Sequence, residues 1–323
     1  MKVVKIIWRI FIILLLISCN KTVETEEAFD EITDETNGEI IDETADVKTK
    51  TDITEVSLPP PPSTLSIIDD PDAQEYIVLA FAKAYPGKIS DVEFLNDDWT
   101  FLINGARFYY AKKRFLPESL RDKWENYAPY DFYKYPWVGS ERERRIAIAQ
   151  PASASGSSYL FDALYASPNE DDSWDMQVKY SFLGVKMLIH SDIKPILDKI
   201  KDLVSAAILE DASISEWLAE LQTSPPTSGW NWRNIAGSSM RSNHSYGMAI
   251  DFLPVDLKGR ITYWRWNSGG GNQPFYRPPE VVIKIFEEYG FLWGGNWDMF
   301  DTMHFEYRPE ILLLNGFSIN IVN

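Results

Sequence analysis

Two short motifs limit the folds that this chain can adopt. The sequence of 323 residues contains three histidines, and two of them, His244 and His304, lie in the stretches Ser242–Asp251 and Asp301–Glu306. His244, Asp251 and His304 offer two imidazoles and a carboxylate, the ligand set of a catalytic zinc that keeps a fourth position open for water. Because one ion can be shared only by converging side chains, we expect a fold that brings the two motifs together.

The spacing inside the first motif predicts a break in the backbone. Residues seven apart on an unbroken strand point to opposite faces, so His244 and Asp251 could not share an ion there. Gly247 can supply a sharp turn, after which 248–252 has the composition of a short strand. The side chains expected to face the core are Met248, Ile250 and Phe252.

The second motif offers several carboxylates for proton transfer. His304 and Glu306 would share one face of a strand, and Asp301 would lie on the loop before it. A carboxylate near the metal can take a proton from water, and Asp301, Glu306 and Asp298 all compete for this role. Glu306 could instead orient a ligand histidine. The opposing interpretation, ordinary buried polar residues, is disfavoured because each motif pairs a histidine with an acidic partner.

The N-terminus is typical of a lipoprotein. Three basic residues precede the apolar run Ile10–Ile17, and Leu16–Cys19 resembles a lipoprotein processing site. We therefore expect a signal peptide at 1–19 and a membrane anchor through a lipid on Cys19. An uncleaved signal anchor is the alternative, although the apolar run is short for a membrane span. Since Cys19 is the only cysteine, disulfides and cysteine-bound zinc are excluded.

An acidic, Pro-containing tether is predicted over residues 20–65. Residues 20–57 hold thirteen acidic residues against three lysines, and Pro59–Pro62 follow. Such a segment buries too little apolar surface to fold. With a net charge of −17 for the whole chain, nucleic acid is not an expected partner.

Residues 66–160 are expected to form an N-terminal accessory region. A helix is predicted over 70–84, and alternating residues at 99–103 and 108–110 flank the hairpin turn Asn104-Gly105. The aromatic residues that follow could stack on glycan or could pack an irregular chain, and their density favours packing. This cluster comprises Tyr127, Tyr130, Phe132, Tyr133, Tyr135 and Trp137.

Residues 161–323 are expected to form the domain that carries both motifs. Strands are predicted at 178–182 and 185–189, and helices after Ser191 and after Pro278. His190 has no neighbouring ligand pattern and is expected to be a structural or surface histidine and not a ligand. The pattern predicts an α+β fold, a small antiparallel sheet with flanking helices around a single zinc site.

A long aromatic loop joins the two motifs. It contains Trp264 and Trp266 and continues into Gly269–Gly271. Loops of this length without a pattern of their own are often functional. We expect this loop to form a rim of the site, with Trp264 and Trp266 contacting substrate.

Taken together, the motifs S-x-H-x-x-G-x-A-x-D, Y-W-x-W, W-G-G-x-W and D-x-x-H-F-E resemble those of the zinc D-Ala-D-Ala carboxypeptidases of bacterial cell walls. This family belongs with the L-Ala-D-Glu endopeptidases and the vancomycin-resistance carboxypeptidases. The resemblance is specific over roughly Val178–Pro309, is weaker over Ala73–Trp137, and does not extend to the tether.

The resemblance implies a role for each site residue. It implies that His244, Asp251 and His304 bind Zn²⁺ and that Asp301 is the catalytic acid and base. It also implies that Arg233 steadies a substrate carboxylate or oxyanion, with Arg241 as a second candidate, and that Ser242 hydrogen-bonds within the site. Spacing and resemblance together favour Asp301 over Glu306 and Asp298 as the base.

These observations predict a zinc metallopeptidase that acts on peptidoglycan stem peptides. Removal of a terminal D-Ala is the expected reaction, and cleavage at an internal L-Ala–D-Glu bond is the alternative. A lipoprotein that binds zinc and cell-wall peptide without cleaving it is a third possibility, and Asp301 argues against it because a binder needs no proton carrier. The expected location is a membrane, facing the periplasm or the cell surface.

Overall fold

The computed structural model describes residues 73–127, 129–130, 132–137, 158–225, 228–235, 240–266 and 274–322. These residues all belong to one compact unit, 51–323. The predicted signal peptide, Cys19, the acidic tether and the glycines Gly269–Gly271 lie outside the described residues. Among the described residues, no helix is both long and apolar enough to cross a membrane.

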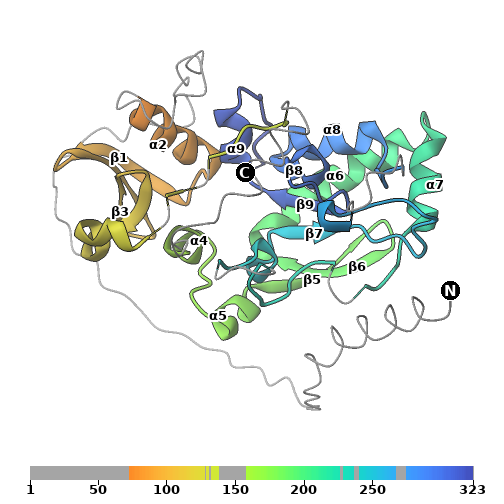
Figure 1. Ribbon diagram of the computed structural model, residues 1–323, viewed down its shortest axis with the longest axis horizontal. Helices are drawn as coiled ribbons and strands as arrows, with labels where there is room; N and C mark the ends of the chain where they lie inside the picture. Colours follow the sequence, from red (N-terminus) through yellow and green to blue (C-terminus); the bar gives the residue numbers. More distant parts are fainter. Residues whose placement is uncertain are drawn as a thin grey trace, which may run out of the picture. The chain divides into compact units, whose positions relative to one another are not determined.

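The first part of the unit is a four-stranded antiparallel sheet with a helix on it (Figure 1). The predicted hairpin is confirmed, since the strands on either side of Asn104 and Gly105 pair and both turn residues have positive φ. The elements are α2 (Ala73–Ala84), β1 (Ile89–Leu95), β2 (Asp98–Ile103), β3 (Ala106–Ala111), β4 (Arg114–Pro117) and the 3-10 helix η4 (Glu118–Asn126).

Helix α2 connects this sheet to the C-terminal part of the chain. One apolar face of this helix is buried, as Ile77 and Phe81 show with exposed fractions of 1% and 0%. Tyr76 on the same helix donates a hydrogen bond of 3.2 Å to the carbonyl of Leu313 in α9 (Pro309–Leu314). The first and last helices of the described chain therefore pack together.

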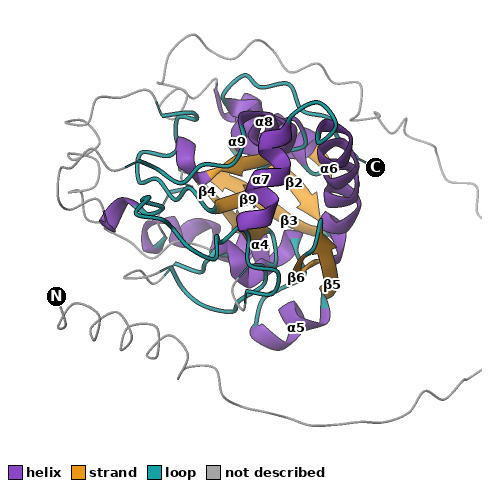
Figure 2. Cartoon of the chain, turned by 90° about the vertical axis from the view of Figure 1, so that its right-hand side faces the viewer, coloured by secondary structure: helices purple, strands orange, loops and turns teal. Residues whose placement is uncertain are grey.

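The middle of the chain forms a second hairpin and most of the helices. The predicted strands pair as β5 and β6, and the predicted helix after Ser191 buries Ile196, Ile200 and Val204. Figure 2 shows α6, α7 and α8 on the outside of the strands. The elements are α4 (Tyr159–Leu164), α5 (Glu170–Asp175), β5 (Gln177–Phe182), β6 (Val185–His190), η5 (Ser191–Ile193), α6 (Lys194–Ala207), α7 (Ala212–Glu220) and α8 (Glu280–Glu288).

A third, three-stranded sheet carries the two histidine motifs. Its strands are β7 (Ala249–Asp251), β8 (Phe291–Trp293) and β9 (His304–Tyr307), in the antiparallel order β7-β9-β8. The predicted strand 248–252 is present in shorter form, and Met248, Ile250 and Phe252 are all fully buried, as expected.

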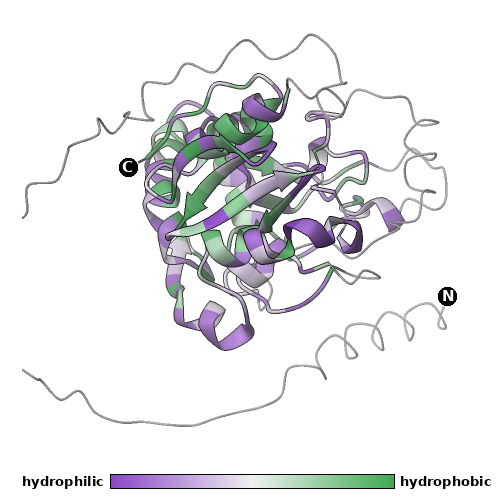
Figure 3. Ribbon diagram, turned by 90° about the vertical axis from the view of Figure 1, so that its left-hand side faces the viewer, coloured by the Kyte–Doolittle hydropathy of each residue, from purple (hydrophilic) through white to green (hydrophobic). Residues whose placement is uncertain are grey.

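The predicted α+β class is confirmed, but the strands form more than one sheet. The sequence predicted one small antiparallel sheet, whereas the described residues form three. One large hydrophobic core nevertheless joins α2 residues such as Phe81 to Phe286 of α8, beside a smaller one that contains Tyr135 and Leu292. Figure 3 shows hydrophobic residues concentrated along the strands and packed helices. The boundary predicted at residue 160 stays a prediction.

The aromatic cluster after β4 serves packing, the interpretation that its density favoured. Tyr135 is buried, and Tyr130 and Phe132 pack against the core with their ring centroids 4.4 Å apart. Tyr130 also packs against Phe81 of α2 at 5.2 Å. These rings therefore connect the first sheet to the rest of the unit.

Candidate metal centre

A short 3-10 helix and a left-handed glycine position His244. Ser242 caps η6 (Asn243–Tyr246), with its hydroxyl accepting from the His244 amide at 3.4 Å. The predicted break is confirmed at Gly247, whose φ is 68°. A Cβ at this position would lie 2.6 Å from the amide nitrogen of His190, so a larger residue does not fit. The turn directs the chain from His244 into β7.

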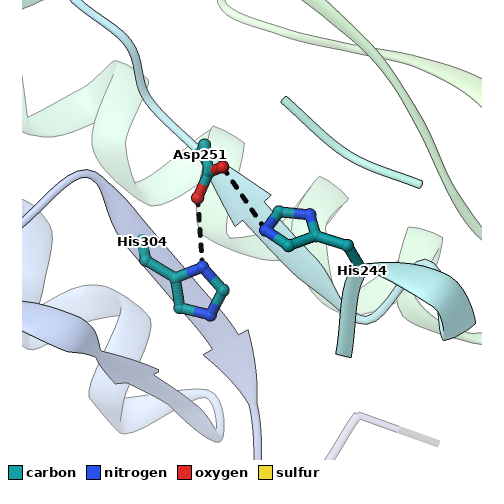
Figure 4. Close-up of side chains that lie close together, drawn as sticks. All are labelled: His244, Asp251 and His304. Carbon is teal, nitrogen blue, oxygen red and sulfur yellow. Dashed lines mark hydrogen bonds and ion pairs between the residues drawn. The ribbon is translucent and has the colours of Figure 1, made fainter. Parts of the chain in front are cut away.

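The pairing of β7 with β9 brings Asp251 opposite His304. Asp251 lies between the two rings, with Oδ2 3.3 Å from His244 Nε2 and Oδ1 3.0 Å from His304 Nδ1 (Figure 4). The three side chains that the sequence predicted to converge therefore do so.

The outer nitrogen of each imidazole has its own acceptor. His244 Nδ1 lies 2.7 Å from the carbonyl oxygen of Gly229, and His304 Nε2 lies 3.1 Å from Glu306 Oε2. We assign a proton to each outer nitrogen from these hydrogen bonds. The inner nitrogens, His244 Nε2 and His304 Nδ1, are then available as ligands, the usual arrangement for metal-binding histidines.

The geometry fits a small divalent cation. One ligand atom from each of His244, Asp251 and His304 can be chosen so that all lie within 4.8 Å of one another. Zinc bonds of about 2.0–2.1 Å hold ligand atoms at most about 4.2 Å apart, so only small shifts are needed. Among the described residues, the buried His244 Nε2 approaches Asp251 but has no hydrogen-bond partner, and an ion would relieve this.

The electrostatics of the centre also favour a cation. Burial opposes the charged forms, but His304 and other donors lower the pKa of Glu306 to about 2, and the imidazoles hold the pKa of Asp251 well below its usual range. Burial lowers the pKa of His304, but Asp251 and Glu306 outweigh it and raise that pKa to about 10. Without a metal, Asp251 and Glu306 therefore keep the His304 ring protonated, and a metal ion would supply this positive charge instead.

Asp301 lies just before β9 and is half-buried. Its amide donates to the carbonyl of Gly294 at 2.9 Å, in η8 (Gly294–Asn296). Burial and the nearby charge of Asp251 raise the pKa of Asp301 to about 6. Its Oδ1 is buried and has no hydrogen-bond partner among the described residues. The competitor Asp298 instead accepts a hydrogen bond from the Met299 amide.

The two candidate arginines differ in their surroundings. The Arg233 side chain is exposed, while its main chain is held against the first motif, with its carbonyl accepting from the Ser242 amide at 3.0 Å. Arg241 is mostly buried, pairs with Asp162 at 2.5 Å, and stacks on Trp232. Arg241 is therefore committed to a structural ion pair.

The aromatic loop borders Asp301. The 3-10 helix η7 (Trp264–Trp266) follows Tyr263, which forms an isolated β-bridge with Asp301. The Trp264 amide donates to the Phe300 carbonyl at 3.0 Å, and Trp266 keeps 59% of its surface exposed. The described part of the loop is thus fixed beside the second motif with an aromatic face open to solvent.

Several residues near the centre were not assigned a role from the sequence. Asn243 donates to Glu306 Oε2 at 2.7 Å, and the Trp297 ring lies 5.2 Å from the His304 ring. Asn243 lies inside the first motif, and Trp297 is the last residue of W-G-G-x-W. Their place in these motifs is the only feature of the sequence that could have indicated a role. The Gly229 carbonyl lies outside every motif, and nothing in the sequence marked it. His190 is structural, as predicted, with Nε2 3.0 Å from the Tyr165 carbonyl.

A His-Asp-His cluster with inward nitrogens and a neighbouring carboxyl, on an α+β fold, is the arrangement expected of a metallohydrolase. A family model described as D-alanyl-D-alanine carboxypeptidase matches residues 236–307, which include all four side chains. The peptidoglycan L-alanyl-D-glutamate endopeptidase CwlK of Bacillus subtilis (strain 168) is 32% identical over 135 residues, covering 38% of this chain and 78% of the relative. The chain therefore belongs to the family of zinc-dependent peptidases that contains these carboxypeptidases and endopeptidases.

The remaining comparisons concern the first sheet and the overall structure. A second family model, described only as a domain of unknown function, matches residues 78–132. No solved structure matches the chain.

Proposed function

We propose that this protein is a zinc-dependent peptidase that cuts the stem peptides of peptidoglycan. The observation that carries the proposal is the convergence of His244, Asp251 and His304 beside the buried carboxyl of Asp301, in a chain of this peptidase family.

His244, Asp251 and His304 would hold the zinc. A zinc ion bound there supplies a Lewis acid and lowers the pKa of a water molecule to about 7. The side chains of Asp251 and His304 keep 16% and 11% of their surface exposed, whereas that of His244 keeps 2%. Substrate would therefore approach from the side of Asp251 and His304.

Asp301 would act as the proton carrier. In the absence of a metal, burial and Asp251 raise its pKa to about 6, so the carboxyl is mostly ionised at neutral pH and can accept a proton. The same carboxyl would then return the proton to the leaving amine. Its unpartnered Oδ1 leaves an acceptor free for this exchange.

Substrate contacts are proposed for residues on both sides of the centre. The exposed guanidinium of Arg233 can form two hydrogen bonds to a stem-peptide carboxylate. Trp264 and Trp266 offer aromatic surface beside Asp301. Ser242 would contribute by holding the turn that positions His244.

Two bonds are candidates for cleavage. The sequence motifs favour release of a terminal D-Ala, which agrees with the description of the family model over residues 236–307. The named relative covers a longer stretch, 135 residues, and is an L-alanyl-D-glutamate endopeptidase. We therefore propose the L-Ala–D-Glu bond as the first substrate bond to test and the D-Ala–D-Ala bond as the second.

A pentapeptide muropeptide tests both reactions. The purified protein is incubated with it, with zinc or with a chelator, and the products are analysed by mass spectrometry. Separation of L-Ala from the rest of the stem supports the endopeptidase, and release of D-Ala supports the carboxypeptidase. The absence of both products in the zinc-loaded sample would contradict the proposed function.

We also propose that the protein is anchored to a membrane through a lipid on Cys19, facing the periplasm or the cell surface. The basic and apolar residues before Leu16–Cys19 support this proposal. Metabolic labelling with a fatty acid should mark the parent but not a Cys19→Ser variant. A parent that remains unlabelled would contradict the anchor.

A further inference from the structure

Glu306 fixes one metal ligand and is itself held by several groups. Its Oε2 lies 3.1 Å from His304 Nε2 and accepts from Asn243 at 2.7 Å. Its Oε1 faces the Tyr133 hydroxyl at 3.4 Å and the Arg308 guanidinium at 3.6 Å. The carboxylate has 6% of its side-chain surface exposed, so protein groups must replace water around its charge.

Arg308 is in turn held by Glu310 and Tyr130. Its Nε binds Glu310 Oε1 at 2.5 Å, and its Nη2 donates to the hydroxyl of Tyr130. The hydroxyls of Tyr130 and Tyr85 both donate to Glu310, at 2.5 and 2.7 Å. Arg308 therefore lies between two carboxylates, and tyrosines from the first part of the chain complete the network.

These tyrosines are far from the metal motifs in sequence. Tyr133 and Glu306 are separated by 173 positions, and Tyr130 and Arg308 by 178. We call Tyr130, Tyr133 and Tyr135 the tyrosine cluster. All three precede residues 236–307, the part that matches the peptidase family model.

The tyrosine cluster also contacts the loop before Asp301. The Tyr133 ring packs edge-on against Trp297 at 6.4 Å, and Trp297 in turn lies 5.2 Å from the His304 ring. The Tyr135 hydroxyl accepts from the Trp293 amide at 2.9 Å. The cluster thus contacts the chain leading to Asp301 directly, and it reaches the His304 ring through Trp297.

We infer that the tyrosine cluster is a positioning part of the metal centre, in which Tyr130 and Tyr133 hold Arg308 and Glu306 so that Glu306 fixes the His304 ring. The inference rests on the proposed zinc site. Groups that orient a metal-bound histidine typically change metal affinity or activity about 10- to 100-fold when removed. The first part of the chain therefore contributes to the chemistry of the centre.

The test is zinc affinity of the full-length protein. A Tyr130→Phe/Tyr133→Phe double variant removes two hydroxyls and keeps both rings. We expect zinc binding, measured by competition with a chromogenic chelator, to weaken about 10-fold or more. The cobalt-substituted protein should also show a shifted visible absorption band, because the band reports ligand geometry and not overall stability.

Tyr110→Phe is the matched control. Tyr110 belongs to the same part of the chain, and its buried hydroxyl has no hydrogen-bond partner among the residues that the structure describes. This variant should bind zinc and cobalt as the parent does. If the double variant fails to fold by circular dichroism, the single Tyr133→Phe variant, which keeps the ring on Trp297, provides the same comparison.

The outcomes separate this inference from the proposed function. A parent that binds no zinc contradicts the proposed function. A parent that binds zinc and cleaves stem peptide, with folded variants of unchanged zinc affinity and cobalt spectrum, overturns the positioning role alone.

Discussion

Asp251 and His304 are direct partners in the antiparallel pairing of β7 with β9, and their side chains meet at 3.0 Å. A slip of one residue in this pairing would turn one of them to the opposite face. The register of the β7–β9 pair therefore determines the geometry of these two metal-ligand candidates. A change that shifts the register should also disturb that geometry.

Asp301→Asn should retain zinc but lose catalysis. An amide cannot accept the proton from water, so we expect kcat to fall about 10²-fold or more. Asp298→Asn is the control, because Asp298 caps the neighbouring Met299 amide and is not placed in the proposed chemistry. Stem-peptide hydrolysis and zinc content are measured together. Full activity of Asp301→Asn would transfer the base role to Glu306.

Removal of zinc should lower the stability only of a protein that keeps all three proposed ligands. An ion that binds the folded state at 100 times its Kd stabilises it by about 2.7 kcal/mol. A chelator should therefore lower the Tm of the parent and leave the Tm of His244→Ala unchanged. Differential scanning calorimetry measures both. An equal chelator effect on the two proteins would contradict His244 as a ligand.

Gly247→Ala should lower the free energy of unfolding by more than the strain of a positive φ alone would. Gly247 and Gly259 have φ of 68° and 78°, but only Gly247 would place a Cβ against the chain, at 2.6 Å from His190 N. We expect Gly259→Ala to cost about 1–2 kcal/mol of unfolding free energy, the strain of the left-handed backbone. Gly247→Ala should exceed this and weaken zinc binding. Urea denaturation of both variants provides the comparison, and equal losses would show that the close approach is unimportant.

Substitution of Arg241 should lower stability, whereas substitution of Arg233 should weaken substrate binding. Arg241→Ala leaves the carboxylate of Asp162, 13% exposed, without its ion-pair partner, so we expect a loss of about 3 kcal/mol of unfolding free energy. Arg233→Ala removes an exposed side chain and should change stability by no more than about 0.5 kcal/mol. Its effect should be a raised KM for stem peptide. A large stability loss in Arg233→Ala, with KM unchanged, would refute this assignment.

His190 should make stability depend on pH. Burial lowers the pKa of this ring, so the unfolded state binds its proton at a higher pH than the folded state does. The contribution is complete above the unfolded pKa of about 6.5 and is lost as the pH falls below it. A His190→Gln variant should lose less unfolding free energy between about pH 7.5 and pH 5.5 than the parent. Identical pH dependence of the two proteins would exclude the effect.

Much of the centre was predictable because its signals are local. Asn104-Gly105 marks a hairpin within a few residues, and Gly247 marks the break that turns His244 toward Asp251. The alternation of side chains at 248–252 is enough to assign the buried face of that strand. These features depend on backbone geometry that a few adjacent residues determine.

Other features depend on packing between distant segments. Tyr133 and Glu306 meet across 173 positions of sequence, and no pattern near either residue indicates the partner. Strand β8 has three residues, Phe291–Trp293, too few for a periodic signal. Which strands pair with which depends on contacts between distant segments, and here the sequence predicted one sheet where the described residues form three.

The acceptor that orients His244 is the peptide oxygen of Gly229, and a Cβ at that glycine would lie 2.1 Å from the oxygen of Leu188. A substitution cannot remove a backbone carbonyl. A point mutation can therefore break the hydrogen bond of His244 only by moving the main chain at Gly229. The Glu306 half, in contrast, is held by side chains and is open to evolutionary tuning. Laboratory selection for altered metal preference should therefore accumulate changes around His304 and leave the surroundings of His244 untouched.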